Sequence, residues 1–170
     1  MYFNNTIIGT TTNEKGEFSI LVKEGQHQLI VSYLGYKTLS YALNTTTYNK
    51  PLTFTLAEES NMLDEIIIKK IVFNNAWKSN LQRFEKEFIG RTKLAKDCKI
   101  LNPKVIFFEF DAMENILTAI PRKPLKIMHK RLGYLITYDL ISFRINNNYV
   151  SYIGYSRYKQ LKGNKRQQKR

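Results

Sequence analysis

The chain has 170 residues, of which 43% are hydrophobic, and a formal net charge of +13. This length fits one domain or two small ones, and no apolar run approaches the roughly 20 residues that a membrane-spanning helix needs. A single cysteine excludes an intrachain disulfide and a zinc site built from several thiolates.

The charge is distributed unevenly along the chain. Residues 1–60 hold four lysines, no arginine and five acidic residues, a net of −1. Residues 61–170 hold 23 basic and nine acidic residues, a net of +14. All the excess positive charge therefore lies in the second part, which predicts two units with different surfaces.

The first sixty residues are typical of short strands separated by turns. Two runs alternate so that their apolar residues share one face, and these are Leu39, Tyr41 and Leu43 in the first run and Leu52, Phe54 and Leu56 in the second. The predicted strands cover residues 18–22, 28–33, 38–43 and 52–56. Strands of this length and spacing predict a β-sandwich.

The turns of this region are marked by glycine. Asn13-Glu14-Lys15-Gly16 is predicted to form a turn in which Gly16 takes a positive φ, a conformation that a β-carbon resists. Phe18 then returns the chain to the core. These residues are therefore assigned to folding, and not to reaction chemistry.

Residues 58–72 are predicted to be a linker or an edge strand, and the periodicity changes after them. Trp77, Leu81, Phe84 and Phe88 are spaced i, i+4, i+7 and i+11, which places them on one face of a helix. Gly90 is the expected C-cap of that helix.

Further strands are expected after the helix. They cover residues 105–110, 116–120, 125–129, 134–138, 141–145 and 149–155. Residues 73–156 are thus predicted to be a small α+β unit, a helix followed by an antiparallel sheet. Residues 157–170 are expected to be a solvated basic tail. The predicted fold class is mainly β with some α.

Three stretches of the sequence carry a family resemblance. Gly9–Phe18 and Val31–Thr38 resemble the carboxypeptidase regulatory-like domain, a transthyretin-like β-sandwich of extracytoplasmic proteins of Bacteroidota. Leu63–Ile68 resembles the linker that follows such domains in TonB-dependent outer-membrane proteins. The resemblance implies a partial sandwich over residues 1–57 and a location in the periplasm, the outer membrane or the cell surface.

The resemblance also implies a truncated N-terminus. The family domain opens with another strand-turn-strand before the equivalent of Tyr2 and Phe3, so the chain is expected to be either a fragment or a reading frame begun at an internal methionine, and an upstream signal peptide would be lost with the missing part. The start of the chain lacks the pattern of a secretory signal, which by itself predicts a cytoplasmic protein. Residues 95–103 and 150–155 resemble segments of flavobacterial proteins for which no activity is implied.

The sequence offers little for catalysis. A nucleophilic role for Cys98 would need His27 or His129, and neither lies in a catalytic motif, so a buried structural thiol is the favoured interpretation. Asp64 and Glu65 are adjacent and would point to opposite faces of a strand. Glu109 and Asp111 border a turn, and Asp139 is isolated.

No glycine-rich phosphate loop and no paired His/Glu zinc pattern is present in the sequence. The prediction is therefore a protein without enzyme activity, cofactor, metal or catalytic residues.

Two functions stay open. The first is a non-catalytic interaction or spacer module of the cell envelope, with an envelope protein or an anionic surface such as lipopolysaccharide or a glycan as its partner. The alternative is a basic nucleic-acid-binding protein, in which four tyrosines would stack on bases beside cationic side chains. The tyrosines are Tyr149, Tyr152, Tyr155 and Tyr158.

Overall fold

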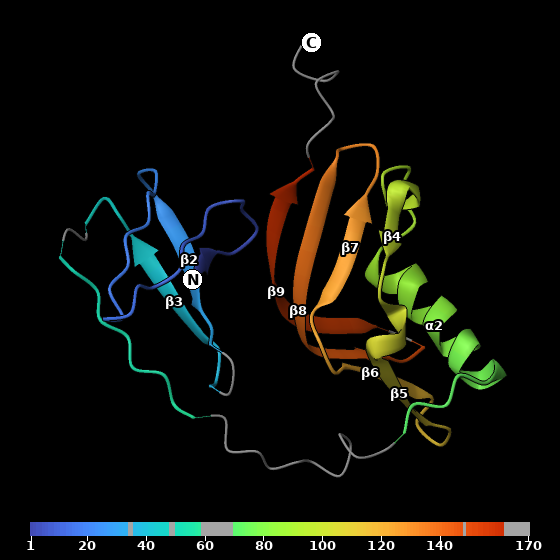
Figure 1. The fold of residues 1–170 in the computed structure, drawn as a ribbon. Coiled ribbons are helices and arrows are strands. Elements are labelled where there is room, and N and C mark those ends of the chain that lie inside the picture. The colour runs from blue at the N-terminus through green and yellow to red at the C-terminus, as the bar shows by residue number, and fades with distance from the viewer. Residues whose placement is uncertain (34–35, 48–49, 59–69, 148, 162–170) are drawn as a thin grey trace. The chain divides into compact units, whose positions relative to one another are not determined.

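The computed structural model describes residues 1–33, 36–47, 50–58, 70–147 and 149–161 (Figure 1). The chain divides into two compact units, Met1–Asp64 and Glu65–Arg170. The predicted linker of residues 58–72 lies mostly outside the described residues, because the description resumes only at residue 70. No helix within the described ranges is long and apolar enough to cross a membrane.

The first unit is built on a small antiparallel sheet. Its strands are β1 (Tyr2–Phe3), β2 (Gln26–Val31) and β3 (Leu39–Asn44), in the order β1-β2-β3. One face of this sheet carries the core of the unit. The buried members of that core are Phe3, Leu29, Val31 and Leu43.

Two extended segments form a second layer on this core. In residues 18–22 and 52–56, every second side chain is half-buried and those between are exposed. The inward side chains pack on the core, and they include Ile20, Val22, Leu52, Phe54 and Leu56. The alternation predicted for residues 52–56 is confirmed, but neither this segment nor residues 18–22 forms the strand predicted for it, because within the described part of the chain no backbone hydrogen bond joins either of them to a neighbour.

The turn before the first of these segments has the predicted form. Gly16 donates its backbone N–H to the Asn13 carbonyl at 3.0 Å, and Asn13 donates to the Glu17 carbonyl at the same distance. Gly16 has φ +79°, in the left-handed region that glycine adopts without strain.

The second unit is an antiparallel sheet with a helix on one face (Figure 1). Its strands are β4 (Cys98–Ile100), β5 (Ile106–Asp111), β6 (Ile116–Pro121), β7 (Leu125–His129), β8 (Tyr134–Ile145) and β9 (Val150–Gln160). β8 is central: β9 pairs along one edge, and the other edge is shared between β7 and β6. Two short 3-10 helices, Ala95–Asp97 and Pro103–Val105, flank β4.

The helix α2 (Asn75–Phe88) has the face that its periodicity predicted. Phe84 is fully buried and packs on Phe143 of β8, with ring centroids 4.7 Å apart. Asn74 caps the N-terminus by accepting the Trp77 backbone N–H at 2.9 Å. Gly90 follows the last turn with φ +88°, as expected of a C-terminal glycine.

Two strand boundaries differ from the prediction. Residues 134–138 and 141–145 belong to one strand, β8, whose register with β9 shifts between Leu140 and Ser142. The extra residue of such a bulge interrupts the alternation without ending the strand. The strand β9 continues to Gln160, so the predicted tail boundary at residue 157 is wrong and residues 157–160 belong to the sheet. Residues 162–170 lie outside the described residues.

The overall fold class is as predicted: mainly β, with antiparallel sheets and a helix. The α+β character of the second unit follows from helix α2 lying on its sheet.

Candidate binding groove

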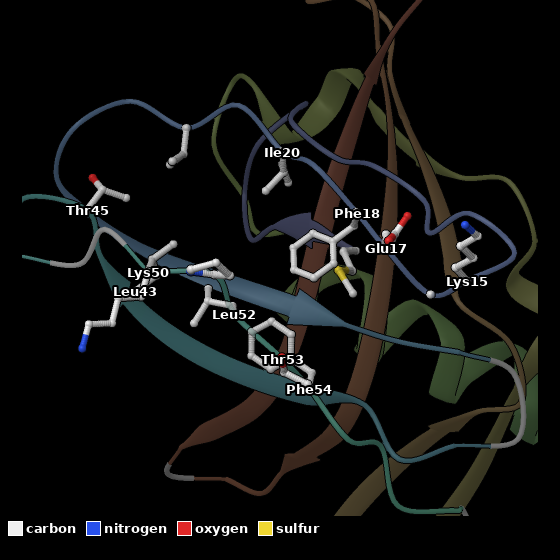
Figure 2. A pocket seen from close by; sticks show the side chains of 14 residues that line it. Lys15, Glu17, Phe18, Ile20, Leu43, Thr45, Lys50, Leu52, Thr53 and Phe54 are labelled. Atoms are coloured by element: carbon white, nitrogen blue, oxygen red, sulfur yellow. The ribbon is translucent and has the colours of Figure 1, made fainter.

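An apolar groove lies in the first unit, between its two extended segments (Figure 2). Its volume is about 540 Å³, which is in the range of small-ligand sites. Its apolar lining consists of Met1, Phe18, Ile20, Val22, Leu43, Pro51, Leu52 and Phe54. We call this the strand groove, because both of its long walls are extended main chain.

The floor of the strand groove is made by side chains that turn inward from both walls. Phe18 and Phe54 point toward each other, and their rings are stacked with centroids 6.2 Å apart (Figure 2). Phe54 also meets Tyr41 of β3 edge-on at 5.3 Å. Leu43 of β3 is buried beneath them. The period-2 alternation of each wall places these groups inward, because successive side chains of an extended chain point to opposite sides.

The rim of the strand groove is polar and carries two lysines. Lys15, which lies in the turn that ends at Gly16, and Lys50, which precedes Pro51, both line the groove and are exposed. Glu17 is the acidic lining residue, and the Asn13 side-chain amide donates to its carboxylate at 2.8 Å. The rim therefore favours a ligand with negative charge.

The described residues that line the strand groove do not form a set of groups for acid–base catalysis. General acid–base catalysis needs titratable groups within hydrogen-bond reach of one another and of a substrate. The titratable side chains that line this groove are the exposed rim residues Lys15, Glu17 and Lys50, and its floor is apolar. No group of three or more His, Cys, Asp or Glu side chains that could hold a metal ion occurs among the described residues.

The cysteine lies in the second unit, opposite a histidine. Cys98 of β4 and His129 of β7 are direct cross-strand partners. However, burial raises the pKa of the Cys98 thiol, and neighbouring Asp97 raises it further. An activated nucleophile needs a lowered pKa, so this thiol is poorly nucleophilic. His129 is buried, and its Nδ1 lies 3.4 Å from the Leu132 backbone N–H.

The other candidate groups that the structure describes do not converge, and Asp64 and Glu65 lie outside the described residues. His27 lies in the first unit, with its Nε2 2.8 Å from the Lys23 carbonyl oxygen. Asp111 accepts the Met113 backbone N–H at 2.9 Å and so closes the turn after β5. Glu109 lies on β5, which is separated from His129 on β7 by β6 and β8. Asp139 lies on β8, opposite Tyr155.

Among the described carboxyl groups, that of Glu85 has a shifted pKa, and no second described carboxylate lines the hollow beside it. Burial raises the pKa of Glu85 on helix α2, and the charge of Lys99 works against this rise. The residues lining the adjoining hollow include Glu85, Cys98 and Lys99 but no second carboxylate. A carboxylate pair of the kind that shares acid and base roles is therefore not formed there.

The four tyrosines expected to stack on bases do not form one surface. Tyr152 of β9 packs against Phe88 of helix α2, with ring centroids 5.5 Å apart. Tyr155 lies three residues further along the same strand. Because successive side chains of a strand alternate, its side chain points to the opposite face of the sheet from that of Tyr152. A continuous stacking platform needs aromatic side chains on one face, so this arrangement does not favour the nucleic-acid hypothesis.

The strand groove was not predicted from the sequence. The alternation predicts that Leu52 and Phe54 share one face, and both side chains do pack on the core of the unit. The alternation of side chains does not show whether the backbone N–H and C=O groups of residues 18–22 and 52–56 are hydrogen-bonded to a neighbouring strand. This backbone pairing is what distinguishes a closed sandwich from an open groove. No local sequence signal reports it.

Comparison with known proteins bears on the first unit. No curated protein and no solved structure matches the chain significantly. A family of non-catalytic modules does match part of it. Residues 1–68 match the family model of the CarboxypepD_reg-like domain, which confirms for this segment the family that its motifs indicated.

Proposed function

We propose that the protein is a non-catalytic interaction module and that the strand groove is where it binds another protein. The observation that carries this proposal is the half-buried apolar floor formed by Phe18, Leu52 and Phe54 between two walls of extended chain. An apolar groove with a polar rim is typical of a recognition site. The family match supports the non-catalytic part of the proposal.

The compartment forms a second part of the proposal. We infer that the protein acts outside the cytoplasm, in the periplasm or at the outer membrane or cell surface, and that it is associated with TonB-dependent systems. The support is the family match together with the resemblance of Leu63–Ile68 to the linker of such proteins. The expected partner is an envelope protein. The charge of the second unit would suit contact with an anionic surface, such as lipopolysaccharide or a glycan.

Site-specific photocrosslinking tests the binding role of the groove. A benzophenone amino acid would replace Thr53, an exposed residue that lines the groove, and in a matched control it would replace Thr38, which is exposed and lies outside the lining. After irradiation with the envelope fraction of the producing cells, we expect an adduct of defined mass from position 53 and not from position 38. Equal labelling at both positions, or no adduct from position 53, would contradict the proposal.

A further inference from the structure

A polar hollow lies in the second unit, between helix α2 and the turn that follows β8. Its volume is about 430 Å³, which is within the size range of small-ligand sites. Four of its lining residues are polar and uncharged, two are basic, one is acidic and one is apolar. They are Ser79, Gln82, Arg83, Lys86 and Glu87 of the helix, and Ile145, Asn146 and Asn147 at the end of β8 and in the turn. We call this site the helix–turn hollow.

The charge that the helix–turn hollow offers to a ligand is positive, because the acid that lines it is paired elsewhere. The Glu87 carboxylate forms an ion pair with Arg91, one turn further along the helix. Arg83 is half-buried and Lys86 is exposed, and among the described residues neither side chain has an ion-pair or hydrogen-bond partner. The planar fork of a guanidinium pairs with a carboxylate through two parallel hydrogen bonds. The helix wall therefore favours an anion of this shape.

The turn that forms the other wall is held in place by hydrogen bonds. The Asn146 side-chain oxygen accepts the Tyr149 backbone N–H at 3.0 Å. Asn115, in the turn between β5 and β6, donates its side-chain amide to the Asn147 side-chain oxygen at 2.6 Å. Because the oxygen of the Asn147 amide accepts this bond, its NH2 group is the end that can donate to a ligand. A wall held in this way loses little conformational entropy on binding.

The lining favours a ligand that carries several hydroxyl groups and an acidic group. The side chains of Ser79, Gln82 and Asn147 can each hydrogen-bond to a ligand hydroxyl. The described lining has no aromatic residue on which a nucleic-acid base could stack. Its apolar member, Ile145, is only 5% exposed, so an apolar peptide side chain would bury little surface there. A sugar that carries a carboxylate matches both the hydroxyl-binding and the cationic groups.

We propose that the helix–turn hollow binds an acidic sugar of a glycan, with the sugar carboxylate on Arg83 and Lys86 and its hydroxyls on the amides of Gln82 and Asn147. This inference rests on the proposed function, because it names a site and a ligand for the expected contact of the second unit with an anionic surface. It does not depend on the strand groove. Since hydrogen bonds to charged groups are stronger than those between neutral groups, loss of the carboxylate should cost more affinity than loss of a hydroxyl.

A nuclear magnetic resonance titration of the isotope-labelled full chain tests the ligand class. The probes are methyl glucuronide and methyl glucoside, which differ only in a carboxylate in place of a hydroxymethyl group, and the galacto epimers of both. We expect a uronide to shift the side-chain signals of Gln82, Arg83 and Asn147. The matching neutral sugar should bind more than about tenfold more weakly. Inorganic phosphate, as a further probe, should also bind more weakly than the uronide, because it has no sugar hydroxyls for the amides.

Two charge variants test the site. Arg83→Gln removes the charge and the fork but keeps a polar side chain, and it should weaken uronide binding more than about tenfold. Lys78→Gln is the matched control, because Lys78 is an exposed cation of the same helix that does not line the hollow. It changes the net charge equally and should leave the affinity unchanged. Both variants should keep the tryptophan emission of the wild type, which checks that Trp77 still bonds to Ile106.

Several outcomes would overturn the inference. Signal shifts spread evenly over the basic residues of the second unit would indicate attraction by net charge alone. Equal affinity for the uronide and the neutral sugar would remove the carboxylate from the site, and equal affinity for inorganic phosphate would remove the sugar. The site itself would be rejected by equal losses in Arg83→Gln and Lys78→Gln, or if neither uronide shifts the lining signals at tens of millimolar.

Vesicles that contain lipopolysaccharide separate this inference from the proposed function. If the wild-type and Arg83→Gln chains bind these vesicles equally well, the contact with an anionic surface stands and the helix–turn hollow is not its site. If the wild type binds them no better than vesicles of neutral lipid, that contact fails as part of the proposed function. Weaker binding of Arg83→Gln, with Lys78→Gln unchanged, supports both.

Discussion

Two glycines illustrate different physical reasons for the absence of a side chain. At Gly16, no atom lies within 4 Å of the position that a β-carbon would take, so the requirement comes from φ +79° alone. At Gly154 of β9, a β-carbon would lie 2.3 Å from Cε1 of Tyr138 and 2.5 Å from the Asp139 carbonyl oxygen. The first glycine permits a backbone conformation, and the second permits a close approach of β9 to β8 at the bulge.

A substitution at Gly16 therefore measures conformational cost without a steric contribution. Gly16→Val should lower the free energy of unfolding of the first unit by about 1–2 kcal/mol, because a β-branched residue is strained at positive φ. Gly16→Asn should cost less, since asparagine tolerates this region. Chemical denaturation followed by circular dichroism would measure both. Equal stability of the wild type and the valine variant would contradict the turn.

The helix α2 depends on a cap as well as on its apolar face. Asn74→Ala removes the acceptor of the Trp77 backbone N–H and should destabilise the second unit by about 1 kcal/mol. Asn74→Asp keeps an acceptor and should leave stability nearly unchanged, while Asn80→Ala, at a half-buried position in the middle of the helix, is the control for losing an asparagine away from the cap. Thermal melts of the three variants would show the difference. A loss in Asn80→Ala as large as in Asn74→Ala would refute the role of the cap.

The sequence predicted those elements whose evidence is local. The period of Trp77, Leu81, Phe84 and Phe88 reports one buried helical face, and the structure has that face packed on the sheet. The strand β4, at Cys98–Ile100, was missed because three residues are too short to show an alternation. Strand pairing is not a local property either: residues 18–22 alternate like a strand, yet within the described ranges no backbone hydrogen bond pairs them with another segment.

For the whole chain, the nucleic-acid hypothesis depends on both the net charge and the placement of the aromatic side chains. A net of +14 on residues 61–170 predicts affinity for polyanions, and that affinity falls as salt rises. The split of Tyr152 and Tyr155 between two faces of the sheet gives no stacking surface to add to it. Charge alone predicts weak binding without sequence preference.

The chain should therefore bind random-sequence DNA at low salt and lose that binding at physiological salt. Deleting residues 162–170 should lower the slope of log affinity against log salt, because five cationic side chains are removed. The deletion must begin after β9, since residues 157–160 belong to that strand. Fluorescence anisotropy across a salt series would measure the slope. Micromolar affinity of the shortened chain at physiological salt would restore the nucleic-acid hypothesis.

The position of the single tryptophan has a practical consequence. Trp77 donates its indole N–H to the Ile106 carbonyl at 3.0 Å and lies against Phe73 and Phe108, so it joins helix α2 to β5. Its fluorescence emission therefore reports whether helix α2 is packed on β5. The first unit contains no tryptophan and contributes no indole signal of its own. The unfolding of the two units can thus be distinguished in one sample. Tryptophan fluorescence follows the second unit, and total ellipticity follows both units.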